Sequence, residues 1–262
     1  MKALVYTGPE AFDLRDVPDP EPGPGEVLIR VESVGICGSD MHAYLGHDAR
    51  RPAPLILGHE AAGTIVGGPR AGERVTINPL VVSPDSPASR AGRDNLCPDR
   101  QIISMPPREG AFSELVAMPE RNLVTIPDGY PFDKAALAEP LSVSWHAARL
   151  AIGALHPAMA RRALVIGGGA IGVAAALCLR AMGIEDVVVS EPNAVRRDFL
   201  QDRTDLPVTD SASGAFPLVV DAVGYAATRA IASERVEPGG VIMHIGLGED
   251  TGGLDIRRMT LQ

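Results

Sequence analysis

A cysteine, a histidine and a glutamate near the start of the chain offer the donor set that Zn²⁺ prefers. Cys37 lies in the stretch GICGSDMH, and His59 and Glu60 follow in GHE. A thiolate, an imidazole and a carboxylate give three protein ligands and leave a fourth coordination position open for chemistry. Ser39 and His42 lie in the first stretch and could carry a proton away from that position. These residues predict a catalytic metal site.

A glycine-rich segment later in the chain predicts a dinucleotide site. Gly167, Gly169 and Gly172 form G-x-G-x-x-G, with Ile171 inside the motif. Such glycines allow a tight turn, close approach of the backbone to a pyrophosphate, and close packing of helix on strand. Glu191 follows about 20 residues on, where a carboxylate accepts hydrogen bonds from the adenosine ribose. We therefore expect these residues to bind NAD.

Two alternatives to the NAD interpretation stay open. The same glycine pattern occurs in other doubly wound folds, such as methyltransferases. Arg196 and Arg197 lie near enough along the chain to neutralise the 2′-phosphate of NADP. Solvated charges on a helix are the more ordinary interpretation of two such arginines.

The first half of the chain has the pattern of a β domain. Short apolar runs alternate with turns rich in proline and glycine, which is typical of a barrel or sandwich. The predicted strands cover residues 2–6, 26–33, 60–66, 74–77 and 111–117.

The pattern changes near residues 133–140, where strands and helices begin to alternate. Alternation of this kind predicts a parallel, doubly wound sheet. The predicted helices cover residues 141–155, 170–182, 194–200 and 226–235. The predicted strands cover residues 163–166, 186–190, 218–221 and 240–247.

Composition narrows the class of protein further. The 262 residues are 45% hydrophobic and carry a formal net charge of −9, which argues against nucleic acid or an anionic membrane as partner. No apolar run approaches the length of a membrane span, and the N-terminus lacks the pattern of a signal peptide. Three widely spaced cysteines, Cys37, Cys97 and Cys178, do not suggest a disulfide framework. We expect a cytoplasmic protein in which Cys178 lies in the core.

Four segments, taken in order, resemble the zinc-dependent medium-chain alcohol dehydrogenases and especially their sorbitol (polyol) and threonine dehydrogenase branch. They read GICGSDMH, GHEAAG, AEPLSVSWHA and VIGGGAIG. The resemblance implies a GroES-like β-barrel catalytic domain over residues 1–146 and a Rossmann NAD-binding domain over residues 147–262. It also implies transfer of hydride from a secondary alcohol, most plausibly a polyol or sugar alcohol, to NAD. Oxidation of L-threonine is the nearest rival activity.

The resemblance assigns a role to each residue around the metal. Cys37, His59 and Glu60 become the ligands of one catalytic zinc, and their two negative charges offset that of Zn²⁺. Glu139 becomes the acidic residue that touches the metal directly or through its water. Asp40 becomes the carboxylate that orients His59 from behind.

Proton transfer is assigned in the same way. The resemblance makes Ser39 the hydroxyl that takes the proton of the bound alcohol, and His42 the outer histidine of the relay. A zinc-independent quinone or enone reductase of the same fold is an alternative, but such an enzyme has no use for the predicted ligands.

The chain departs from the family pattern in two places. Many members hold a structural zinc with four cysteines, and the matching positions here are Ser83, Ser86, Ser89 and Cys97. A lone thiolate cannot close a tetrahedral site, so we expect no structural zinc and a loop over residues 82–98 ordered by its own turns.

The second departure is at the C-terminus. The sequence stops at Gln262, where the resemblance implies further chain that includes a strand used in dimerisation. We therefore expect a C-terminally truncated member of a family whose full-length proteins form dimers or tetramers. A non-catalytic fragment that binds the cofactor without turnover is the alternative from another functional class.

Overall fold

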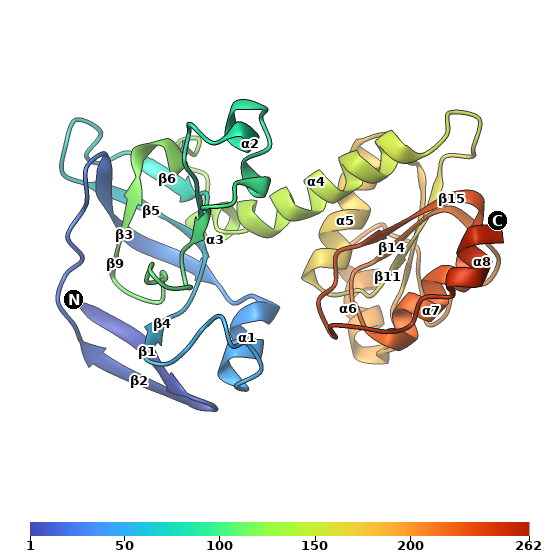
Figure 1. Ribbon diagram of the computed structural model, residues 1–262, viewed down its shortest axis with the longest axis horizontal. Helices are drawn as coiled ribbons and strands as arrows, with labels where there is room; N and C mark the ends of the chain where they lie inside the picture. Colours follow the sequence, from blue (N-terminus) through green and yellow to red (C-terminus); the bar gives the residue numbers. More distant parts are fainter. Residues whose placement is uncertain (262) are drawn as a thin grey trace. The chain divides into compact units, whose positions relative to one another are not determined.

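The structure, a computed structural model, describes residues 1–261 and divides into two compact units (Figure 1). The first unit is Met1–Glu139, and the second begins at Pro140. The boundary therefore lies in the first turn of α4 (Ala138–Ala154), whereas the sequence placed it between residues 146 and 147. The difference arises because α4 runs without interruption through that position and buries Ala148 and Ala151 in the core of the second unit.

The first unit is built on antiparallel strands. A five-stranded sheet has the order β10-β6-β5-β3-β9, a three-stranded sheet the order β2-β1-β4, and β7 pairs with β8. Ile29, Val75 and Met118 are fully buried in its main core. The strands are β1 (Lys2–Gly8), β2 (Ala11–Asp16), β3 (Glu26–Gly35), β4 (Leu55–Ile56), β5 (Glu60–Val66), β6 (Arg74–Ile77), β7 (Leu80–Val81), β8 (Gln101–Ile102), β9 (Leu115–Pro119) and β10 (Leu123–Thr125).

Short helices fill the connections of this unit. They are α1 (Gly38–Tyr44), α2 (Pro87–Arg90), η1 (Asp94–Leu96), η2 (Glu120–Asn122) and α3 (Phe132–Ala135). Helix α1 follows β3 directly and was not predicted, because its seven residues are too few to show a helical repeat.

The second unit has a parallel sheet of five strands in the order β13-β12-β11-β14-β15. From β11 the chain adds β12 and β13 on one side and then β14 and β15 on the other, so the strand order reverses at β11 and creates a switch point at the carboxyl ends of these parallel strands. The strands are β11 (Arg162–Ile166), β12 (Asp186–Ser190), β13 (Val208–Thr209), β14 (Phe216–Asp221) and β15 (Val236–His244). The helices are α5 (Ala170–Ala181), α6 (Ala194–Arg203), α7 (Ala226–Arg235) and α8 (Ile256–Leu261).

Helices cover both faces of this sheet. Leu218 and Val220 of β14 pack into one core with α4 and α5, while Val219 between them packs into another with α7. Cys178 lies in the first of these cores, as predicted. The alternation of side chains along a strand that is buried on both faces confirms the predicted doubly wound fold.

Two predicted strands were wrong in their bounds. Residues 111–114 lie outside β9 because the amides of Ala111 and Phe112 donate to carbonyls of Gly58 and Leu57 in an irregular loop. Strand β15 begins earlier than predicted and ends at His244, because the next two amides both turn to the carbonyl of Asp221.

Candidate metal centre and dinucleotide site

The register of two strands brings the predicted metal ligands together. Gly35 at the end of β3 pairs with Glu60 at the start of β5, so Cys37 and His59 leave adjacent strand ends. The ligand atoms of Cys37, His59 and Glu60 all lie within 4.8 Å of one another. A side chain at Gly35 would meet the Glu60 carboxylate, which would have to move away from its present position.

Asp40 lies directly behind the cluster and is 2% exposed. Its Oδ2 accepts a hydrogen bond from the Cys37 amide at 2.9 Å, and its Oδ1 accepts one from the Gly58 amide at 3.3 Å. The same Oδ1 lies 3.6 Å from Nδ1 of His59. Asp40 therefore ties both ligand-bearing segments together and faces one ring nitrogen of His59, which leaves Nε2 as the nitrogen for a metal.

Two side chains face the Nδ1 atom of His59. Oγ of Ser104 lies 3.4 Å from this nitrogen, and Asp40 is the second. Burial lowers the pKa of His59, but its contacts with Asp40 and Cys37 outweigh burial and raise that pKa to about 10. A proton and a metal ion therefore compete for this imidazole.

The cluster contains buried carboxylates that a positive charge would stabilise. Burial raises the pKa of Glu60 and that of Glu139, the acidic residue predicted to touch the metal, which lies in the first turn of α4. Attraction to His59 lowers both values, while repulsion among Asp40, Glu60 and Glu139 raises them. A divalent cation would relieve this repulsion, and thiolate, imidazole and carboxylate donors suit Zn²⁺. The donor set thus fits the predicted metal.

The predicted proton acceptor, Ser39, has a partner that the sequence did not reveal. Arg51 is 3% exposed and donates from Nη2 to Ser39 Oγ at 3.3 Å. It also donates from Nε to the carbonyl of Ser104 at 3.0 Å and pairs through Nη1 with Asp48 at 2.5 Å. Arg51 thus links the Ser39 hydroxyl to the segment that contacts His59. In the sequence, Arg51 appears only as a charged residue in a loop, and no pattern indicates that Ser104 contacts His59.

His42 lies one turn along α1 from Ser39, on the same face of the helix. Its ring centroid is 6.5 Å from that of His47. His42 is half-buried, which suits a group that exchanges protons with solvent.

The segment that matches the family's structural-zinc lobe keeps a compact turn. Ser86 begins α2, and its Oγ accepts from the Ser89 amide and lies 3.0 Å from Ser89 Oγ. A hydrogen bond from Ser86 lowers the pKa of Cys97, which is fully buried. The Ser83 carbonyl accepts the Ser86 amide at 3.2 Å. The three serines and the cysteine thus gather around one turn.

The glycine-rich loop has the geometry expected of a pyrophosphate cradle. Gly167 has φ +98°, a conformation that favours glycine, and a side chain there would meet Val223. A side chain at Gly172 would collide with the Gly167 carbonyl, so helix and strand pack closely here. Gly169 begins α5 with open space around its Cα, and Ser144 donates to the carbonyl of Ile171.

Glu191 follows β12 and is 2% exposed. Its Oε2 accepts from the Gly168 amide at 2.8 Å and from Arg196 at 3.0 Å, and its Oε1 accepts from the Asn193 amide at 2.9 Å. Burial raises the pKa of Glu191, but these donors outweigh it and hold the pKa below its usual value. Arg197 donates to the backbone carbonyls of Glu191 and Pro192. Both arginines are therefore bound to the Glu191 turn rather than simply solvated.

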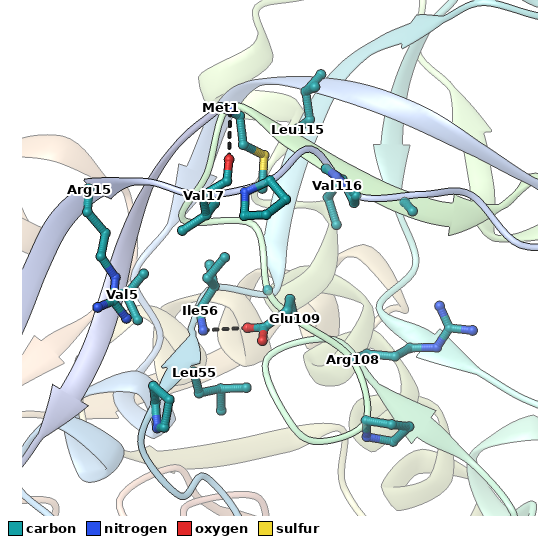
Figure 2. Close-up of a pocket in the computed structure, with 16 residues that line it drawn as sticks. Met1, Val5, Arg15, Val17, Leu55, Ile56, Arg108, Glu109, Leu115 and Val116 are labelled. Carbon is teal, nitrogen blue, oxygen red and sulfur yellow. Dashed lines mark hydrogen bonds between the residues drawn. The ribbon is translucent and has the colours of Figure 1, made fainter.

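A separate cavity of about 430 Å³ lies in the first unit, and Figure 2 shows its lining. Aliphatic and proline side chains form most of the wall, and Glu109 accepts the amide of Ile56 at 2.6 Å. None of the predicted site residues lines this cavity. The cavity is therefore distinct from the predicted reaction site.

A β unit with a thiolate, imidazole and carboxylate cluster, followed by a doubly wound unit with a dinucleotide loop, defines the class of metal- and dinucleotide-dependent dehydrogenases. A family model, the alcohol dehydrogenase GroES-like domain, matches residues 23–128. The chain belongs to the zinc-dependent medium-chain alcohol dehydrogenase family, in its polyol branch.

Relatives of known name support this membership. L-galactonate-5-dehydrogenase of Escherichia coli K12 is 33% identical over 94% of this chain and 76% of its own length. Human sorbitol dehydrogenase is 38% identical over 74% of this chain, which spans 56% of that enzyme. The structure of acetophenone reductase from Geotrichum candidum in complex with NAD matches 99% of this chain and 79% of that chain, with a TM-score of 0.87 and 27% identity. No helix within residues 1–261 is long and apolar enough to cross a membrane.

Proposed function

We propose that this chain oxidises a secondary hydroxyl of a polyol or a related sugar acid and transfers hydride to NAD. The observation that carries the proposal is the cluster of Cys37, His59 and Glu60, with Ser39 on the adjoining helix. Two of the relatives are named for sorbitol and L-galactonate, and both of these compounds carry secondary hydroxyls on a polyhydroxylated chain.

In this proposal Cys37, His59 and Glu60 hold one zinc ion, and Glu139 lies at the edge of the site. When bound, Zn²⁺ would polarise the substrate hydroxyl and the dinucleotide would accept hydride. Asp40 fixes the ring plane of His59 through Nδ1.

In this proposal Ser39 and His42 transfer the proton of the substrate hydroxyl. Ser39 Oγ accepts the proton of the substrate hydroxyl as it gives up its own hydroxyl proton in the direction of His42, and His42 takes up that proton and releases it to solvent. Arg51 holds the Ser39 hydroxyl in place by donating to its oxygen.

The second unit binds the dinucleotide. The loop of Gly167, Gly169, Ile171 and Gly172 receives the pyrophosphate at the start of α5. Glu191 receives the adenosine ribose with the remaining acceptor capacity of Oε1, and its pairing with Arg196 favours NAD over NADP.

We further propose a protein of the cytoplasm that has no structural zinc and that is a homo-oligomer in its full-length form. Three free cysteines, Cys37, Cys97 and Cys178, fit a reducing compartment. Light scattering of the full-length protein would test the oligomeric state, with a dimer or tetramer expected and a monomer contradicting it.

A substrate panel tests the activity. Zinc-loaded protein would be assayed for NADH formation with sorbitol, xylitol, L-galactonate and L-threonine, with Cys37→Ser and Ser39→Ala as variants. Turnover of a polyol or L-galactonate that is lost in Cys37→Ser supports the proposal. Preference for L-threonine would favour the rival activity, and NADH binding without any turnover would favour a non-catalytic fragment.

A further inference from the structure

A buried carboxylate and a half-exposed histidine form a pair at the carboxyl edge of the parallel sheet. Asp221 ends β14 and His244 ends β15, and the two are register partners. Oδ2 of Asp221 lies 3.2 Å from Nδ1 of His244. The Asp221 side chain is fully buried, whereas that of His244 is 32% exposed. The predicted cofactor residues do not include this pair.

Asp221 fixes the histidine firmly. Its Oδ1 accepts the amides of Val223 at 3.1 Å and Gly224 at 3.0 Å, so the carboxylate cannot turn without breaking the loop after β14. Because Oδ2 faces Nδ1, the neutral imidazole places its proton on Nδ1 and presents Nε2 as an acceptor. Nε2 makes no hydrogen bond to any of residues 1–261.

The pair lies beside the glycine-rich loop. Ile166, the last residue of β11, pairs with Asp221, which in turn pairs with His244. Val223 fills the space where a side chain at Gly167 would lie. The loop after β14 therefore lies against the predicted pyrophosphate cradle, and His244 lies one strand beyond it.

The distance across the sheet matches an extended dinucleotide. The adenosine ribose is assigned to Glu191, which follows β12 on one side of the switch point. His244 ends β15 on the other side, three strand spacings away. At about 4.8 Å for each spacing, the separation is about 14 Å. A dinucleotide that begins at Glu191 and crosses the cradle must place its second nucleoside near the ends of β14 and β15.

We propose that His244 binds the nicotinamide nucleoside of NAD, with Nε2 accepting a hydrogen bond from a hydroxyl of the second ribose while Asp221 fixes the ring. The inference rests on the proposed function for the presence of the dinucleotide, and it adds a binding residue on the half of the cofactor that the glycine motif and Glu191 do not reach.

Titrations with NADH and with ADP separate this role from a structural one, because ADP lacks the second nucleoside. The purified chain would be titrated by NADH fluorescence and by calorimetry with ADP. We expect His244→Ala to weaken NADH binding about 5- to 10-fold, the effect of one lost hydrogen bond. Binding of ADP should stay within about twofold of the wild type, and His244→Gln, which keeps an acceptor, should recover most of the NADH affinity.

Two further variants complete the test. His244→Leu fills the space without an acceptor. If the alanine variant does not fold, the NADH affinities of His244→Leu and His244→Gln can be compared, and a lower affinity for the leucine variant supports the role of the acceptor. His156→Ala is the control, because His156 precedes β11 and so lies toward the amino ends of the strands, away from the carboxyl ends where His244 lies.

Unchanged NADH affinity in His244→Ala and His244→Leu would overturn the inference and leave the proposed function intact. Equal weakening of NADH and ADP would also overturn it, because the histidine would then act through the loop as a whole. Absence of NADH binding by the wild-type chain would overturn the proposed function together with the inference.

Discussion

Arg51 donates a hydrogen bond from Nη2 to Oγ of Ser39 over 3.3 Å, although the two residues are separated by a turn of helix and a loop. A buried guanidinium thus contacts the hydroxyl assigned to proton transfer, and its Nε holds the Ser104 carbonyl. The proposed proton acceptor and the environment of His59 therefore share one positioning group.

Replacing Arg51 should slow turnover more than it weakens binding. In Arg51→Met the Ser39 hydroxyl loses its donor, and we expect kcat to fall about 10- to 100-fold, the effect of a lost charged hydrogen bond. The KM for NAD should stay within about twofold. Arg51→Lys should recover part of kcat, and Arg203→Met, at an exposed arginine of α6, is the control. If Arg51→Met has the same zinc content and the same kcat as the wild type, Arg51 does not position Ser39.

Asp40→Asn should weaken zinc binding. The asparagine keeps the shape of the side chain but loses the charge that faces His59 Nδ1, and loss of such a partner typically costs about 10- to 100-fold in metal affinity. Competition with a chromophoric chelator measures the change. Asp16→Asn, at a carboxylate that is 81% exposed, serves as the control. Equal zinc affinity of Asp40→Asn and wild type would remove Asp40 from the site.

Asp48 should make stability depend on pH at the acid end. Hydrogen bonds from Arg50 lower its pKa from 3.8 to about 2, against the effect of burial. Because the folded pKa lies below the unfolded one, the stabilisation is complete above about pH 4 and is lost as pH falls toward 2. Urea unfolding should show wild type more stable than Asp48→Asn by about 1 to 2 kcal/mol at pH 7. That difference should shrink between pH 4 and pH 2, and a difference that is constant over this range would contradict the assignment.

Glu191 should set the choice between NADH and NADPH. In Glu191→Ala the adenosine ribose loses its acceptor and Arg196 loses its carboxylate partner. We expect NADH binding to weaken about tenfold while NADPH binding is kept or improved. Fluorescence titration of both cofactors measures the ratio, and exposed Glu185→Gln is the control. An unchanged ratio would mean that Glu191 is only a structural support for the Gly168 turn.

The sequence predicted the parts of this protein that depend on local pattern. The ligand trio, the glycine motif and the alternation of strands and helices all leave signals within short windows. The three predicted ligands lie together because β3 and β5 pair in a register that places Gly35 opposite Glu60. The motifs predicted the ligands without any knowledge of this register.

The parts that the sequence did not predict depend on contacts between distant residues. Ser104 reaches His59 across 45 positions, and Arg51 reaches the Ser104 carbonyl across 53. The Asp221 and His244 pair likewise follows from the parallel register of β14 and β15 rather than from spacing along the chain. Single residues of this kind carry no periodicity, so only the tertiary structure shows their role.

Zinc content per chain is the measurement that decides whether the metal centre exists. Protein washed with a weak chelator would be measured by metal analysis beside Cys37→Ser and Cys97→Ser. We expect about one zinc per chain in the wild type and in Cys97→Ser, and loss of that zinc in Cys37→Ser. An absence of zinc from the wild type, or zinc that persists in Cys37→Ser, would contradict a metal centre built on Cys37, His59 and Glu60.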